Sequence, residues 1–130
     1  MAFFKRVQKK VNDLWYPQSV TWGKAVTTRE VADELSVLST VTRGDTYAVM
    51  ENLGRVLSNF MGQGRTVKID GIGTFYYTAT STKRGVPTAE EVSASLINGA
   101  RVRFLPEVER NSGNQVTTRS MVNAKIVWKE

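Results

Sequence analysis

Basic residues in the second half of the sequence recur at the spacing of a β-strand. In the segment before Pro106, Arg101 and Arg103 alternate with the apolar residues Val102 and Phe104. Successive side chains of a strand point to opposite faces, so one face has guanidinium groups and the other is apolar. Guanidinium groups bind the phosphates of nucleic acids. The alternation therefore indicates either a face that binds a polyanion or a solvated face that only prevents edge-to-edge pairing.

Other basic residues accompany this strand. Lys68 lies in a neighbouring predicted strand, and Lys83-Arg84-Gly85-Val86-Pro87 lies where a flexible arm would emerge. A basic tip with an apolar residue and a rigid proline is typical of a minor-groove wedge, although an ordinary loop has the same composition. An N-terminal basic cluster either binds phosphate or keeps an edge strand soluble. The candidate DNA-contacting residues are Lys9, Lys10, Lys68, Lys83, Arg84, Pro87, Arg101 and Arg103.

Composition disfavours catalysis. The 130 residues include no Cys and no His, which removes the thiol nucleophile, the common zinc ligands and the most frequent general base. Two Gly-x-Gly patterns precede strands, whereas a nucleotide loop needs a following helix. We therefore expect no enzyme, metal, cofactor or small-molecule substrate. No apolar run approaches the roughly 20 residues that span a bilayer, and no secretory signal is evident, so we expect a cytoplasmic protein without a membrane partner.

The net charge of +6 favours a polyanionic partner and is unevenly distributed. The segment from Thr28 to Gly62 has three basic and five acidic residues, a net charge of −2, which leaves +8 for the remainder. The basic surface is therefore expected on the strands and termini.

Two amphipathic helices are predicted in this acidic segment. Thr27 and Glu30 form a capping box that begins the first helix, and Thr42 begins the second. Gly62 or Gly64 supplies the left-handed residue that ends it. The apolar stripe of the second helix is wider than one short helix can cover, which favours a dimer interface. The expected interface residues, with two strand phenylalanines, are Tyr47, Met50, Leu53, Leu57, Phe60, Phe75 and Phe104.

Strand formers predominate outside the helices. Residues 15–22 are expected to be a connector, because Pro17 cannot continue a central strand. Residues 88–97 fit a short helix better than a strand, and Asn111–Asn114 is a predicted turn. The segments expected to be strands are 3–11, 66–69, 74–82, 100–105 and 116–128.

Residues 28 to about 106 resemble the HU and integration-host-factor superfamily of histone-like proteins. The matching features are Thr42-x-x-Asp45, the run Val67-Lys68-Ile69-Asp70-Gly71-Ile72-Gly73-Thr74-Phe75, and Val102-Arg103-Phe104. The segments 12–17 and 39–45 are similar to the HU-related branch of Bacteroides-type bacteria. The resemblance implies an α+β, IHF-like fold: a two-helix hairpin, then an antiparallel sheet with a β-arm, here with extra N- and C-terminal strands. It also implies an intertwined homodimer that binds and bends double-stranded DNA with little sequence preference, in the nucleoid.

The expected organisation is one globular unit in three parts. Residues 1–26 form an N-terminal strand extension, residues 27–106 the HU-like domain and residues 107–130 a strand-like tail. Family arms usually end in Arg-Asn-Pro, whereas this chain has Val86-Pro87. Two other functions remain open: an HU-like structural or protein-interaction module that has lost DNA binding, and a single-stranded nucleic-acid binder with exposed sheet aromatics.

Overall fold

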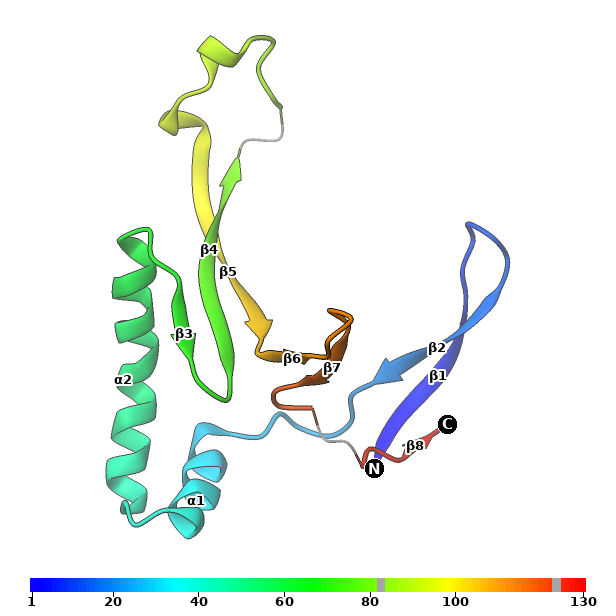
Figure 1. The fold of residues 1–130 in the computed structure, drawn as a ribbon, viewed down its shortest axis with the longest axis vertical. Coiled ribbons are helices and arrows are strands. Elements are labelled where there is room, and N and C mark those ends of the chain that lie inside the picture. The colour runs from blue at the N-terminus through cyan, green and yellow to red at the C-terminus, as the bar shows by residue number, and fades with distance from the viewer. Residues whose placement is uncertain (82–83, 123–124) are drawn as a thin grey trace.

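The computed structural model describes residues 1–81, 84–122 and 125–130 (Figure 1). In these ranges the chain has the expected α+β composition, with two α-helices and sheets whose pairings are antiparallel apart from one. In chain order the elements are β1 (Ala2–Gln8), β2 (Trp15–Val20), α1 (Thr28–Leu38), α2 (Arg43–Gly62), β3 (Val67–Ile69), β4 (Gly73–Ser81), β5 (Ile97–Pro106), β6 (Val108–Arg110), β7 (Val116–Arg119) and β8 (Trp128–Lys129).

The two helices begin where their capping residues predict. The Thr27 hydroxyl accepts a hydrogen bond from the Glu30 amide, and the Glu30 carboxylate accepts one from the Thr27 amide at 2.7 Å, which completes the capping box of α1. The Thr42 hydroxyl accepts the Asp45 amide and caps α2. Both predicted helix starts are confirmed. They could be predicted from the sequence because a cap depends on residues only three positions apart.

Helix α2 ends in a Schellman motif. The amide of Gly64 donates to the Met61 carbonyl at 3.0 Å, and the amide of Arg65 donates to the Phe60 carbonyl at 3.3 Å. Gly64 has φ of +81°, so it is this residue, and not Gly62, that adopts the left-handed conformation. The motif turns the chain back along the helix toward β3.

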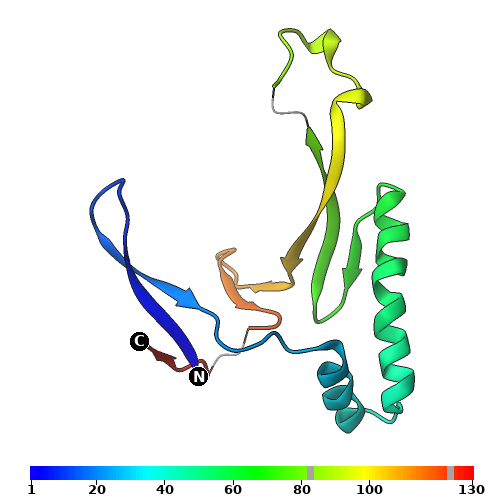
Figure 2. The same ribbon diagram turned by 180° about the vertical axis from the view of Figure 1, so that it is seen from behind.

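The central sheet has the order β3-β4-β5 and is antiparallel throughout. It packs beside α2, and α1 packs against the N-terminal end of α2 (Figures 1 and 2). The buried residues among those described are few: Ala32, Thr46, Met61 and Gly73. The core therefore lies between the helices and the start of β4, and much apolar surface stays exposed.

A second sheet joins the two ends of the chain. We call it the terminal sheet, with the order β2-β1-β8, in which β8 pairs parallel to β1. The expectation of a connector at residues 15–22 was wrong, because Trp15–Val20 is strand β2 and Pro17 pairs with Arg6. Strand β2 is an edge of this sheet, where a residue without an amide proton is tolerated. The N-terminal strand ends at Gln8, earlier than predicted, and the chain turns through residues 9–13.

The excursion between β4 and β5 contains no α-helix in its described part. The helix expected over residues 88–97 is replaced by two short 3-10 turns, Ala89–Glu91 and Ala94–Leu96. Val92 and Ser93 between them are extended. An isolated helix of this length is marginal without a packing partner, and here the excursion projects away from the helices (Figure 1).

The tail is also divided differently from the prediction. Residues 116–128 do not form one strand: β7 pairs with β6, whereas β8 lies in the terminal sheet. The predicted turn Asn111–Asn114 is confirmed as the connection between β6 and β7. After β7 the chain turns at Met121, whose φ is +67°. The Ser120 side chain is hydrogen-bonded to the Ile72 carbonyl, which fixes the chain beside the β3–β4 turn and ends the strand there.

Candidate nucleic-acid interface

The register of the central sheet brings its cations to one face. In that register Arg103 lies opposite Tyr76, Arg101 opposite Thr78, and Lys68 opposite Thr74. Residues opposite each other point to the same face, and these positions alternate with apolar ones along each strand. Lys68, Arg101 and Arg103 therefore share a surface, which we call the cationic face.

The other face of the central sheet is apolar and turned toward α2. The rings of Phe75 and Phe104 lie 4.9 Å apart, and Tyr77 lies opposite Val102. The Tyr77 hydroxyl is 3.2 Å from the Ser58 hydroxyl of α2, which fixes the side on which the helix lies. The helix thus leaves the cationic face uncovered.

The guanidinium groups of the cationic face are accessible. Arg101 and Arg103 are exposed, and neither forms an ion pair with a residue that the structure describes. The Arg103 Nε donates a long hydrogen bond of 3.5 Å to the Thr78 hydroxyl, which orients the group without neutralising it. Neither the β6–β7 hairpin nor the terminal sheet covers these arginines.

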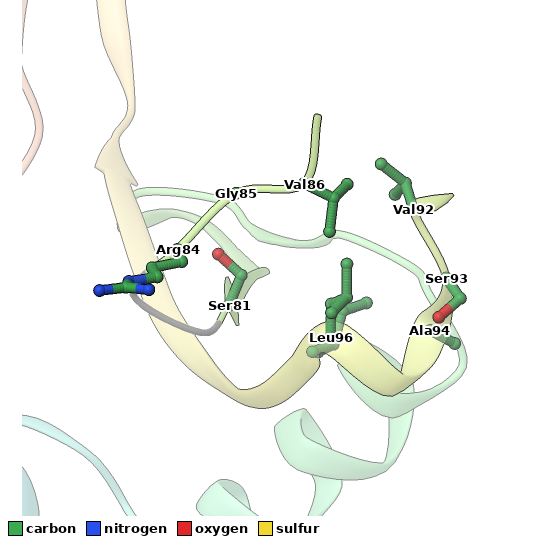
Figure 3. Close-up of a pocket in the computed structure, with 9 residues that line it drawn as sticks. Ser81, Arg84, Gly85, Val86, Val92, Ser93, Ala94 and Leu96 are labelled. Atoms are coloured by element: carbon green, nitrogen blue, oxygen red, sulfur yellow. The ribbon is translucent and has the colours of Figure 1, made fainter. Parts of the chain in front are cut away.

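The β4–β5 hairpin extends well beyond the rest of the sheet (Figure 1). Lys83 lies outside the described residues. Arg84 and Pro87 are exposed in the excursion, and Glu90 and Glu91 follow them, so this region has both charges. The excursion surrounds a hollow of about 550 Å³ lined mainly by apolar side chains. Figure 3 shows Val86, Val92 and Leu96 around this hollow, with Arg84 at its end.

Lys9 and Lys10 lie elsewhere. They occupy the turn between β1 and β2, so the structure does not place them on the cationic face. The Lys9 ammonium lies 4.6 Å from the centre of the Tyr16 ring, a cation–π contact. Lys129 of β8 lies in the same sheet as Lys5, and the sequence did not indicate this because no local pattern pairs β8 with β1.

The seven candidate interface residues line α2 and the adjoining sheet face. Leu53 is 42% exposed, Phe60 40% and Phe104 37%, whereas Tyr47, Met50, Leu57 and Phe75 are half-buried. Together these large, partly exposed apolar side chains form an apolar surface that no other described part of the chain covers.

The described residues contain neither a metal-binding cluster of acidic side chains nor a membrane-spanning helix. No cluster of three or more acidic side chains there could hold a metal ion. Neither of the two helices in those ranges is long and apolar enough to cross a membrane.

Two helices, antiparallel sheets and a cationic sheet face are consistent with an HU-like fold. The family HU-HIG, described as an HU domain fused to wHTH, Ig, or glycine-rich motif, matches residues 3–122. The chain belongs to this family.

A solved structure has a similar fold. It is a crystal structure from Bacteroides vulgatus ATCC 8482, provisionally described as a bacterial DNA-binding protein, with a TM-score of 0.55 and 17% sequence identity. The alignment covers 80% of this chain and 40% of that one, so the chain spans less than half the length of that protein. No curated protein matches the sequence.

Proposed function

We propose that this protein binds double-stranded DNA without sequence specificity and bends it, as a homodimer in the bacterial nucleoid. The observation that supports this most is the cationic face, where Lys68, Arg101 and Arg103 lie together, exposed, on the side of the sheet away from α2. Membership of an HU family supports the same class of ligand. The proposal includes a cytoplasmic location and neither catalysis nor a cofactor. The proposal also assigns the chain to the Bacteroides-type branch, which the similar segments 12–17 and 39–45 favour.

Surface area supports the homodimer. The chain exposes 11377 Å², whereas a compact monomer of 14.5 kDa exposes about 6,900 Å². The excess is several times the roughly 800 Å² that each partner buries in a standard interface. Two copies that pack their α2 stripes and the apolar sheet faces together would bury much of it. The candidate interface residues lie on that stripe and on the adjoining sheet face.

The lack of sequence preference follows from the kind of contact. Lysine and arginine on an extended sheet face bind backbone phosphates, which position the protein but have no sequence information. In a dimer, the β4–β5 hairpins of the two copies are the proposed arms, with Arg84 and Lys83 at phosphates and Pro87 as the wedge. Insertion of a wedge between base pairs would bend the duplex toward a larger contact surface.

The test is duplex binding over a series of salt concentrations. Replacing Lys68, Arg101 and Arg103 together by Gln should weaken binding and lower the slope of log K against log salt by about 0.9 for each lost phosphate contact. A matched control replaces Arg29, Arg55 and Arg119 by Gln, which removes the same charge from the helices and β7. Equal slopes for wild type and the cationic-face variant would contradict the proposal.

Two further measurements address bending and the other candidates. Energy transfer between dyes at the two ends of a duplex should increase on binding, and Pro87→Ala should reduce that increase. Competition between a duplex and a single strand distinguishes double-stranded from single-stranded nucleic-acid binding. Tyr76 on the cationic face would favour single-strand binding, because aromatic rings stack on bases. If the dimer binds neither duplex nor single strand, the protein is instead an HU-like structural or protein-interaction module.

A further inference from the structure

Most of the net charge of this protein lies outside residues 27–106. Residues 27–106 have nine basic and eight acidic residues. Residues 1–26 have five basic and one acidic residue, and residues 125–130 have two basic and one acidic residue, so these two segments supply +5 of the net +6. Both segments meet in the terminal sheet. The cationic face of the central sheet does not explain this concentration of positive charge in the terminal segments.

The terminal sheet places its lysines on one face. Along β1, Phe3, Lys5 and Val7 share a face by alternation, and the register puts Lys129 of β8 beside Phe3. Tyr16 lies opposite Val7 on this same face, and the ammonium of Lys9 lies over its ring. Lys5, Lys9 and Lys129 thus form a row, which we call the lysine face.

The opposite face of the terminal sheet has a different character. It has Phe4, Pro17 and Trp128 around an apolar hollow of about 430 Å³. The one cation of β1 on this side, Arg6, is paired with Glu130 at 2.7 Å. The sheet therefore has lysines that form no ion pair with any described residue on one side, and apolar side chains with a neutralised arginine on the other.

Protection of a sheet edge against strand pairing could apply to Lys129 on the edge strand β8, but it does not account for Lys5. Lysines on edge strands discourage aggregation, but β1 is the central strand of this sheet and Lys5 lies in its middle. The terminal segments have two acidic residues among those described. Asp13 lies in the β1–β2 turn, and Glu130 forms an ion pair with Arg6. The lysine face has no carboxylate of its own sheet to balance it.

The geometry points to a second DNA-binding surface on the lysine face, which contacts backbone phosphates of a duplex. This inference rests on the proposed function, because the ligand is the duplex that the central sheet binds. Alternate positions of β1 are about 6.7 Å apart, close to twice the 3.4 Å rise per phosphate of one DNA strand, so a row of lysines can follow a backbone. The β1–β2 and β4–β5 hairpins project to the same side of the molecule, away from α1 (Figures 1 and 2). A single duplex can therefore meet both.

The test compares three proteins on duplexes of increasing length over a salt series. The lysine-face variant is Lys5→Gln, Lys9→Gln and Lys129→Gln, since Gln removes the charge and keeps a flexible polar side chain. The control is the variant with Arg29, Arg55 and Arg119 replaced by Gln. On long duplexes, the slope of log K against log salt should be smaller in magnitude by about 2.7 for each engaged protomer of the lysine-face variant. The control variant should keep the wild-type slope. On duplexes too short to reach the terminal sheet, wild type and lysine-face variant should bind equally.

The possible failures are distinguishable. If wild type binds duplex with a steep salt slope and the lysine-face variant keeps that slope, the second surface is refuted while the proposed function stands. If wild type shows no salt-dependent duplex binding, the proposed function itself fails. Loss of binding to vesicles that contain phosphatidylserine, with the DNA slope unchanged, would assign the lysine face to a membrane and overturn the inference. Circular dichroism checks folding, and the single variant Lys5→Gln, with an expected slope change of about 0.9, replaces the triple if it unfolds.

Discussion

Gly73 lies directly against the backbone of Leu105. A β-carbon at Gly73 would be 2.2 Å from the Leu105 carbonyl oxygen and 2.8 Å from the ring of Phe104, and the residue is buried with φ of +151°. Glycine is required here by both space and backbone conformation. The contact closes β4 onto β5 at the point where the apolar side chains of the central sheet begin, so it also fixes the register of the cationic face.

The first prediction concerns this contact. Gly73→Ala should destabilise the protein by about 2–4 kcal/mol, because the β-carbon forces the two strands apart and strains the backbone. Chemical denaturation followed by circular dichroism measures the change. Gly44→Ala is the control: nothing lies within 4 Å of its β-carbon and φ is not positive, so it should be neutral or stabilising. Similar stabilities for the two variants would show that β4 and β5 do not approach so closely.

The second prediction concerns the apolar stripe of α2. Leu53→Asp with Leu57→Asp should convert the proposed dimer to monomer, because two buried carboxylates in an apolar interface cost several kcal/mol. Sedimentation equilibrium measures the mass. Val37→Asp with Leu38→Asp on α1, where the side chains are 81% and 83% exposed, also introduces two carboxylates, but away from the stripe, and should leave the mass unaltered. A double variant that stays dimeric would place the interface elsewhere.

The third prediction concerns the attachment of the β6–β7 hairpin. The Ser120 hydroxyl donates to the Ile72 carbonyl and accepts the Glu107 amide at 2.9 Å. Ser120→Ala should cost about 1–2 kcal/mol and increase amide exchange at Gly71, whose amide donates to the Glu107 carboxylate at 2.7 Å. Ser112→Ala in the exposed turn is the control. Unchanged exchange at Gly71 would mean that the hairpin does not support the β3–β4 turn.

The fourth prediction concerns pH. The hydrogen bond from the Thr27 amide, and then that from its hydroxyl, lowers the pKa of Glu30 below its usual 4.5. A carboxylate whose pKa is lower in the folded state stabilises the protein above pH 4.5, and this stabilisation disappears as the pH falls through the folded pKa. Glu30→Gln should therefore reduce the thermal midpoint at pH 7 more than at pH 3. An equal reduction at both pH values would exclude a charged capping box.

Part of the cationic face could be predicted from the sequence. The alternation around Arg101 and Arg103 indicated one basic face, because side-chain direction along a strand is a local property. That Lys68 shares this face required the register of β3 on β4, which the turn through residues 70–72 and Gly73 set. Lys83 belongs to the residues outside the described ranges, and the assignment of Arg84 and Pro87 to DNA stays a prediction.

The sequence by itself determined the features that depend on neighbours a few residues apart: the caps at Thr27 and Thr42, the glycine-ended helix and the turn at Asn111–Asn114. Only the tertiary structure decided which distant segments pair. It made Pro17 part of an edge strand, divided residues 116–128 between two sheets and brought Lys129 beside Phe3. Strand pairing across most of the chain depends on which edges remain free after the local elements have formed, and no short pattern encodes that.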